Sequence, residues 1–318
     1  MIISKCPLRI SLSGGSTDLQ EFVDHYGHGS VISFPCNLYS YITLFTDKNG
    51  YNSVDNKYII KYSKKEEVGS ISEISNDVAR ECLNRFKLPP VNVDFFSDIF
   101  SHGSGLASSS AYMIALIKAA SIYNKTNLNQ GQICELALEL ERIFNPLTGC
   151  QDAYGCGIGG FKKMDFFPDG KVRCKVFSHS FLDNYNKYLV YTGISRNSTD
   201  ILKTLNLKKV EALLPLVKKM EKSITRNKPL DFFDIINESW AKKKETSDFI
   251  ISDSKMLEID EKLSKIKDVK AHKLCGAGGG GYFLVFTDKN YDLKKIQGFD
   301  NITFKIECDW YGVNAGEL

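Results

Sequence analysis

A stretch of small and hydroxyl-bearing residues in the first half of the chain has the composition of a phosphate-binding loop. It reads Gly103-Ser104-Gly105-Leu106-Ala107-Ser108-Ser109-Ser110-Ala111, between a predicted strand and a predicted helix. Glycines let a backbone curl until successive N–H groups converge on an anion, and the following helix adds its positive dipole end. A serine-rich helix cap without a ligand would look similar, so both interpretations stay open. The segment lacks the lysine of a Walker A loop and does not match the G-x-S-x-G elbow of serine hydrolases.

Two carboxylates farther along the chain are further candidates for chemistry. Glu141 lies at the edge of the apolar face of a predicted helix, which would place its carboxylate beside the core. Asp152 follows Pro146 and Gly149, in a segment that we predict to be too broken for a regular helix. The alternative is a surface glutamate and a turn aspartate, because most carboxylates in proteins are exposed.

A third candidate lies at the start of the chain, where Arg9 precedes the turn Gly14-Gly15-Ser16-Thr17-Asp18. A strand that ends in a Gly-Gly turn, with an arginine before the turn and an aspartate just past it, could grip a polyol. Asp18 could equally cap a helix that begins at Leu19.

Two other glycine-rich stretches, residues 155–160 and 276–281, literally contain G-x-G-x-x-G. A dinucleotide site would require this motif to follow the first strand of a βαβ unit and to open a helix. Gly281 leads into a predicted strand instead, so we expect no nicotinamide cofactor.

Hydrophobic periodicity predicts the elements that must position these residues. Period-two patterns and apolar runs predict β structure at residues 31–45, 91–96, 188–192 and 282–286, and a hairpin over 161–177 turned by Pro168-Asp169-Gly170. Helical patterns cover residues 71–86, 197–226, 230–250 and 254–266, and a helix follows Gly105 with Met113, Ile114, Ile117 and Ala120 on one face. Asn129 and Gln132 form the signature of a capping box that opens another helix.

Composition limits the class of protein. The 318 residues are 43% hydrophobic, and 41 basic against 38 acidic side chains give a net charge of +3. No basic stripe with interleaved aromatic residues indicates nucleic-acid binding. The nine cysteines include no CxxC pair and the sequence contains no apolar run of about 18 residues. Its first residues predict a strand, so we expect no secretory leader. We therefore expect a cytoplasmic protein with reduced thiols and without membrane or nucleic-acid partners.

Taken in order, these segments resemble the GHMP kinases, named for galactokinase, homoserine kinase, mevalonate kinase and phosphomevalonate kinase. Residues 7–18 are similar to the first motif of that family, residues 103–111 to its phosphate loop, and residues 276–281 to its third motif. The spacing of Glu141 and Asp152 resembles that of the metal ligand and the catalytic aspartate in mevalonate-kinase-like members.

Within the family, the chain is most similar to the D-glycero-D-manno-heptose 7-phosphate kinases. This likeness rests on the following residues: Gly14-Gly15-Ser16-Thr17-Asp18, Gln151-Asp152, Tyr191-Thr192-Gly193 with Ser195-Arg196, Trp240 with Lys243-Lys244, and residues 273–281. Ala107 and Ser16 each replace a glycine of the family pattern. We expect the loop to absorb Ala107 if its φ angle is negative.

The resemblance implies a role for each candidate residue. Asp152 would be the catalytic base, with Arg9 as its partner, and Ser109 and Glu141 would hold Mg²⁺. The nucleotide-binding residues would be Gly103, Ser104, Gly105, Leu106, Ala107, Ser108 and Ser110. The substrate-binding residues would be Gly15, Ser16, Thr17, Asp18 and Gly278, with Arg196 and Lys243 gripping a phosphate of the substrate.

The resemblance also implies a fold and a reaction. The fold would be α+β in two domains: residues 1–184, an α/β domain with a left-handed βαβ unit, and residues 185–318, a ferredoxin-like domain. With ATP and Mg²⁺ as cofactors, the enzyme would phosphorylate a hydroxyl, expected to be anomeric, of a small-molecule sugar or sugar phosphate. D-glycero-D-manno-heptose 7-phosphate would give the 1,7-bisphosphate for nucleotide-activated heptose synthesis. The alternatives are a GHMP kinase of the galactose, fucose, mevalonate or homoserine type, or a GHMP-like binding protein without activity, and a homodimer is left open.

Overall fold

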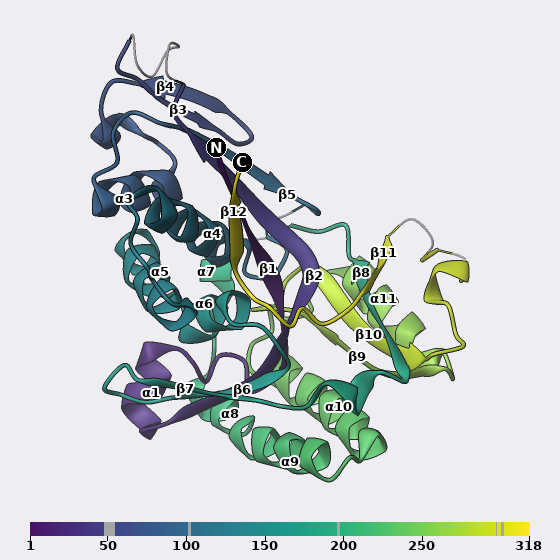
Figure 1. Ribbon diagram of the computed structural model, residues 1–318. Helices are drawn as coiled ribbons and strands as arrows, with labels where there is room; N and C mark the ends of the chain where they lie inside the picture. Colours follow the sequence, from purple (N-terminus) through teal and green to yellow (C-terminus); the bar gives the residue numbers. More distant parts are fainter. Residues whose placement is uncertain (48–54, 101–102, 196–197, 297, 300–301) are drawn as a thin grey trace.

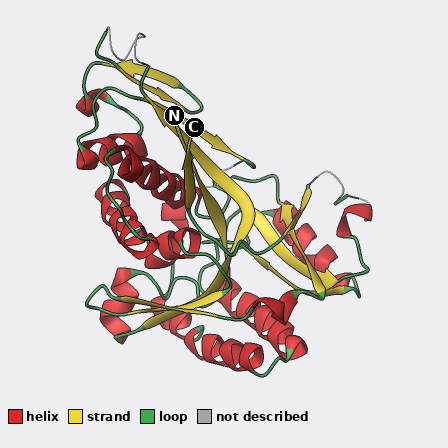
Figure 2. Cartoon of the chain, in the orientation of Figure 1, coloured by secondary structure: helices red, strands yellow, loops and turns green. Residues whose placement is uncertain are grey.

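The computed structural model describes residues 1–47, 55–100, 103–195, 198–296, 298–299 and 302–318. Figure 1 shows a long, twisted sheet that runs through the molecule and a smaller sheet beside its lower half. Figure 2 shows the helices gathered on the flanks of both sheets. Arg196, a predicted substrate-binding residue, lies outside the described residues.

The larger sheet is built on two long antiparallel strands, β1 (Ile2–Ser13) and β2 (Gly29–Phe45). Its strand order is β12-β1-β2-β5-β3-β4, and β6 pairs with both β2 and β7. The bounds of the other strands are β3 Tyr58–Lys61, β4 Lys65–Val68, β5 Asn92–Ser97, β6 Lys162–Phe166, β7 Val172–Val176 and β12 Asn314–Glu317. The predicted hairpin over residues 161–177 is confirmed as β6 and β7.

Helix α4 (Ser108–Tyr123) packs against β1 and β2 and against helices on its other sides. Those helices are α3 (Asp77–Phe86), α5 (Gln130–Phe144) and α6 (Cys150–Gly157), while α1 (Gln20–Tyr26) lies near β2. The prediction of one apolar face on α4 was too narrow, because Ala115, Leu116 and Ala119 on other faces are also fully buried. The predicted capping box is confirmed: Asn129 and Gln132 bond to each other's backbone N–H at the start of α5.

The smaller sheet has the order β11-β8-β10-β9, and all its neighbouring strands are antiparallel. The strands are β8 Tyr185–Tyr191, β9 Val269–Leu274, β10 Tyr282–Asp288 and β11 Thr303–Ile306. Helices separate β8 from β9, and a short 3-10 turn, η3 (Leu293–Lys295), separates β10 from β11. This is the β-α-β-β-α-β order of a ferredoxin-like unit, with the 3-10 turn in the place of the second helix. The α+β fold implied by the resemblance is confirmed. Its left-handed crossover and its division after residue 184 stay predictions.

Two predictions about helices were wrong. Residues 197–226 are not one helix but contain α7 (Ser198–Leu202), α8 (Leu207–Glu211) and α9 (Leu214–Thr225). Asn206 caps α8 by accepting from Lys209 N, and Pro215 lies in the first turn of α9, so each starts a new helix. Conversely, Asp152 lies within the regular helix α6, which the glycines around it do not prevent.

The described helices include none that combines the length and the apolar character needed to cross a membrane. The long helices of the second half are α10 (Pro229–Glu245) and α11 (Ser254–Lys265); α11 has nearly its predicted bounds, whereas α10 ends five residues before the predicted residue 250.

A partly buried carboxylate joins α10, α11 and β9. Asp260 accepts hydrogen bonds from Trp240 Nε1 at 2.7 Å and Lys244 Nζ at 2.9 Å, and its Oδ1 lies 2.8 Å from His272 Nε2. Burial alone would raise the pKa of Asp260, but the contacts with His272, Trp240 and Lys244 outweigh it and lower that pKa to about 2. Lys243 precedes Lys244 on α10, so the contacts of Asp260 also fix the position of the helix that carries Lys243.

We predict that Asp260→Asn lowers the free energy of unfolding by about 2 kcal/mol at pH 7. A carboxylate whose pKa is depressed on folding stabilises the protein above the pKa of the unfolded chain, about 4, and loses that effect as pH falls toward 2. Urea unfolding at pH 7, 5, 4 and 3 should therefore show the gap to the native protein closing at the acid end. Glu238→Gln, which removes an exposed pair with Lys219, is the control and should change little. A gap that stays constant with pH would contradict this role of Asp260.

Candidate active site

The floor of the main cavity is one face of β1. Arg9, Ser11 and Ser13 alternate along the strand and line a cavity of about 880 Å³. The wall contains parts of the predicted phosphate loop and of the turn at residues 14–18, together with Glu141 and Asp152. Lys243 of helix α10 and Lys273 of strand β9 also line the cavity.

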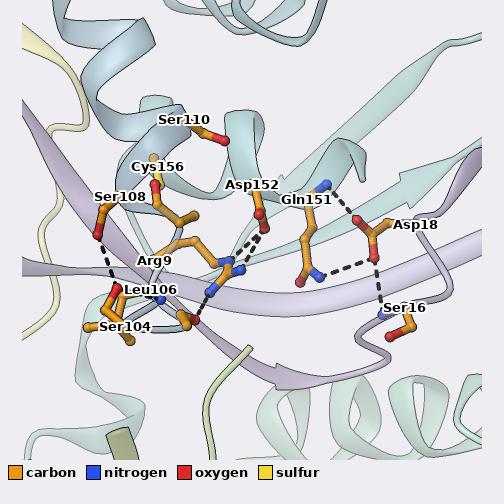
Figure 3. Close-up of polar contacts among 12 residues, drawn as sticks. Arg9, Ser16, Asp18, Ser104, Leu106, Ser108, Ser110, Gln151, Asp152 and Cys156 are labelled. Carbon is orange, nitrogen blue, oxygen red and sulfur yellow. Dashed lines mark hydrogen bonds and ion pairs between the residues drawn. The ribbon is translucent and has the colours of Figure 1, made fainter. Parts of the chain in front are cut away.

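Arg9 and Asp152 form an ion pair at the centre of this cavity (Figure 3). Arg9 Nε and Nη2 donate to Asp152 Oδ1 at 2.9 and 2.7 Å, and Nη1 donates to the Gly105 carbonyl oxygen at 2.5 Å. Burial alone would lower the pKa of Arg9, but the Asp152 charge raises it above its ordinary value. Asp152 lies in the first turn of α6, and its side chain keeps 27% of its surface exposed. The carboxylate is therefore fixed on one side and open to the cavity on the other.

The predicted phosphate loop curls as expected before α4. Gly103 and Gly105 have φ angles of 64° and 76°, and Ser104 Oγ bonds to both Leu106 N and Ser108 Oγ. A Cβ on Gly105 would lie 2.7 Å from the Cys275 carbonyl oxygen. The phosphate loop therefore packs directly against the start of the glycine-rich loop at residues 276–281. Ala107 does not meet the condition on which its tolerance in the loop was expected to depend, a negative φ: its φ is 62°, a left-handed conformation that glycine adopts more easily.

Glu141 lies on α5 at the cavity wall and is 2% exposed. Ser110 Oγ donates to its Oε2, and no described residue forms an ion pair with it. Burial raises the pKa of Glu141 to about 7, although the hydroxyls of Ser110 and Ser109 oppose this shift. Ser109 is exposed at the start of α4. A buried carboxylate beside an open hydroxyl gives the hard oxygen donors that suit Mg²⁺.

Asp18 lies beside Gln151, the neighbour of Asp152, and does not cap the helix α1 that follows it; its carboxylate bonds instead to the first turn of α6. Its carboxylate accepts from Ser16 N, Gln151 N and Gln151 Nε2, each at 3.1 Å (Figure 3), whereas α1 begins at Gln20 without a side-chain cap. Burial, and after it the charge of Asp152, raises the pKa of Asp18 to about 6. A Cβ on Gly149 would lie 2.0 Å from Asp18 Oδ2, so only glycine fits there.

Of the remaining predicted substrate-binding residues, some line the cavity and others do not. Gly15 and Ser16 line the cavity, and Ser16 accepts a 2.8 Å hydrogen bond from Lys243 Nζ. Thr17 is fully buried with its hydroxyl bonded to the Gly14 and Ser30 carbonyl oxygens, so it holds the turn and does not line the cavity. Gly278 packs against Ile250 and leaves the cavity wall to Gly276 and Ala277.

Three residues that the sequence did not single out as site residues contribute to this arrangement. Gln151 aligns Asp18, and Lys273 lines the cavity with its Nζ 2.9 Å from the Leu12 carbonyl oxygen. Burial lowers the pKa of Lys273 to about 8. Lys162 is fully buried behind α6 and donates to the carbonyl oxygens of Gly155 and Ile158 at 3.1 and 2.5 Å. Gln151 carried a signal in the sequence as the neighbour of Asp152, and Lys273 carried one as the first residue of the segment 273–281, whereas Lys162 carried none.

The chain is similar to known proteins in both sequence and fold. The family model for the N-terminal domain of GHMP kinases matches residues 73–160. The D-glycero-alpha-D-manno-heptose 7-phosphate kinase of Campylobacter jejuni is 31% identical over 94% of this chain and 94% of that protein. A crystal structure of a D-glycero-D-manno-heptose 1-phosphate kinase from Bacteroides thetaiotaomicron has a TM-score of 0.79 and 19% identity, covering 100% of this chain and 99% of that one. The mevalonate kinase of Methanococcus jannaschii has a TM-score of 0.70 and 18% identity, covering 97% of this chain and 98% of that one.

The two solved structures share the fold, and the Campylobacter protein shares the sequence along nearly the whole of both chains. The family that the motifs predict is thereby confirmed. This chain belongs to the GHMP kinase family and is an ATP-dependent kinase.

Proposed function

We propose that this kinase transfers the γ-phosphoryl group of ATP to the anomeric hydroxyl of D-glycero-D-manno-heptose 7-phosphate, giving the 1,7-bisphosphate for nucleotide-activated heptose synthesis. The observation that carries the proposal is the Arg9–Asp152 pair, which stands between the phosphate loop on one side and the buried Asp18 on the other. The likeness to the Campylobacter kinase along nearly the whole chain supports the choice of acceptor.

The nucleotide would bind with its phosphates against residues 103–110. Phosphoryl transfer depends on positioning and on neutralising charge more than on covalent chemistry. Backbone N–H groups at the left-handed turns and at the first turn of α4 would donate to the phosphate oxygens. Arg9 adds a fixed positive charge beside this loop, because its guanidinium is held by Gly105 and Asp152.

Ser109 and Glu141 would hold Mg²⁺ together with phosphate oxygens of the nucleotide. The fit rests on Glu141, a buried carboxylate without an ion-pair partner among the described residues, and on the exposed hydroxyl beside it. When bound, the cation would neutralise phosphate charge that otherwise repels the incoming hydroxyl.

Asp152 would accept the proton of the acceptor hydroxyl as the new O–P bond forms and the bond to the ADP oxygen breaks. Its Oδ1 bonds to Arg9, which leaves Oδ2 as the oxygen for the acceptor. Asp18 and Gln151, next to Asp152 in the same cavity, would bind sugar hydroxyls and fix the direction of attack.

The acceptor side of the cavity is also suited to an anionic group. Lys243 and Lys273 are both more than nine-tenths buried and line the cavity where β1 runs into the turn that carries Ser16. Lys243 bonds to a hydroxyl oxygen and Lys273 to a carbonyl oxygen, and Lys273 has no carboxylate within ion-pair distance among the described residues. A phosphate on the acceptor would compensate the buried charge of Lys273, and Lys243 lines the same cavity.

We predict that Asp152→Asn folds but lowers kcat by about 10²–10⁴-fold, the usual range for a general base. Steady-state kinetics with ATP and heptose 7-phosphate, at matched circular dichroism, would measure the loss. Asp169→Asn, in the exposed hairpin turn, is the control and should retain native turnover. Near-native kcat in the Asp152 variant would remove this residue from the chemistry.

Ser109→Ala and Glu141→Gln should each raise the Mg²⁺ concentration needed for half-maximal activity, because an oxygen donor to the cation is lost. A magnesium titration at saturating ATP would measure the shift. Glu139→Gln, exposed on the same helix as Glu141, serves as the matched control. An unchanged magnesium requirement in both variants would show that the ligands are elsewhere.

Lys273→Met and Lys243→Met should each raise the KM for the phosphorylated acceptor by about 10–100-fold, the value of a charge-assisted hydrogen bond. The KM for ATP and the activity on the unphosphorylated sugar should change much less, because the lost charge faces the acceptor phosphate. Lys242→Met, on the same helix outside the cavity, is the control. Equal losses on both sugars would argue against an acceptor phosphate at this place, while leaving the kinase reaction itself intact.

A further inference from the structure

Two cysteines far apart in the sequence face each other across a pair of antiparallel segments. Cys36 lies in β2, and Cys308 lies between β11 and β12 in the segment that returns to the larger sheet. Asn37 N donates to the Glu307 carbonyl oxygen at 3.0 Å, and Asp309 N donates to the Pro35 carbonyl oxygen at 2.7 Å. These two bonds flank the cysteines, so Cys36 and Cys308 form a non-hydrogen-bonded cross-strand pair.

This type of pair has the geometry that a disulfide requires. The Cα atoms of a non-hydrogen-bonded pair lie about 4.5 Å apart, with both side chains on the same face of the sheet. Disulfides span Cα separations of roughly 4.4–6.8 Å, so the bond needs rotation of the two side chains and no movement of the backbone. Both thiols are free in this structure.

The surroundings give one thiol access to small reagents and keep the other enclosed. Cys36 is fully buried, whereas Cys308 is partly exposed and lines a cavity of about 110 Å³ together with Lys187 and Trp310. Burial raises the pKa of Cys308 to about 12, although Lys162 and Lys187 oppose this shift. The thiolate fraction at neutral pH is therefore small, and oxidation should be slow and faster at higher pH.

We propose that Cys36 and Cys308 are the site of a cross-strand disulfide that forms when a peroxide oxidises the protein. The Cys308 sulfur would attack the O–O bond of hydrogen peroxide, giving a sulfenic acid and one water. The Cys36 sulfur would then attack the Cys308 sulfur, forming the S–S bond while the S–O bond breaks and a second water leaves. Two thiols lose two electrons and two protons, and one peroxide is reduced to two waters.

The disulfide would join β2 to the segment after β11, and both of these contact elements that carry active-site residues. The segment after Cys308 bonds to the end of α6 and the loop behind it: Gly160 N donates to the Asp309 carbonyl oxygen and Val313 N to the Gly157 carbonyl oxygen. On β2, Cys36 pairs with Leu8 of β1, next to Arg9. Since the paired backbones are already in place, the cross-link should leave kcat within about two-fold while restricting the unfolded chain.

The test uses the full chain, oxidised with hydrogen peroxide, alkylated and digested without reduction. Mass spectrometry should find peptides of Cys36 and Cys308 joined, with a mass about 2 Da below their sum, and dithiothreitol should release them. The two residues are 272 positions apart (308 minus 36), and closing so long a loop should raise the melting temperature by roughly 3–10 °C.

Cys36→Ala and Cys308→Ala should each abolish this shift, whereas Cys174→Ala, at the exposed thiol of β7, should retain it. The mass measurement on the native chain does not depend on how well any variant folds. Full alkylation of both cysteines after oxidation, or joining of either one to a different cysteine, would overturn the proposal.

Discussion

The Arg9 guanidinium joins three parts of the molecule that are distant in the sequence. Arg9 belongs to strand β1, which forms the floor of the cavity. Its Nη1 donates to the Gly105 carbonyl oxygen in the phosphate loop, and Nε and Nη2 donate to Asp152 at the start of α6. The backbone takes part as well, because Arg9 N donates to the Leu106 carbonyl oxygen. Removing the carboxylate of Asp152 would leave the Arg9 charge buried without an opposite charge, which is more costly than losing an exposed ion pair.

The pair imposes constraints on its neighbours. Gly155, one turn after Asp152, has no side chain where Arg9 passes: a Cβ there would lie 3.1 Å from the Arg9 stem. At the other end of α6, Lys162 binds carbonyl oxygens that the helix leaves without partners. A buried lysine and a buried arginine therefore fix the two ends of one short helix, and the catalytic candidate between them has little freedom to move.

Local signals in the sequence were sufficient for those parts of the fold that neighbouring residues determine. The capping box at Asn129 and the turn at Pro168-Asp169-Gly170 depend on contacts within a few residues, and both were predicted correctly. Helix α6 was missed because its glycines argue against a helix, and the contacts that favour it come from Arg9 and Lys162, outside the segment. The breaks in residues 197–226 were overlooked although Asn206 and Pro215 marked them.

The site likewise contains residues that could be predicted from local motifs and residues that only distant contacts place there. The phosphate loop and the Arg9 and Asp152 candidates could be named from motifs, and the structure brings them together in one cavity. The contact of Gln151 with Asp18 spans 133 residues and that of Lys273 with Leu12 spans 261, so no local pattern could reveal them. Ala107 and Ser16, at the two positions where the family pattern has glycine, both have positive φ angles, of 62° and 76°, a conformation that glycine adopts more easily.

The position of β12 has a consequence for the order in which the chain can fold during synthesis. β12 begins at Asn314 and pairs with β1, which ends at Ser13, so one edge of β1 has no partner until the ribosome has made nearly all the described residues. An unpaired edge invites pairing with other chains. The opposite edge of β1 can pair with β2 much earlier, so only the edge that later receives β12 stays open until the end.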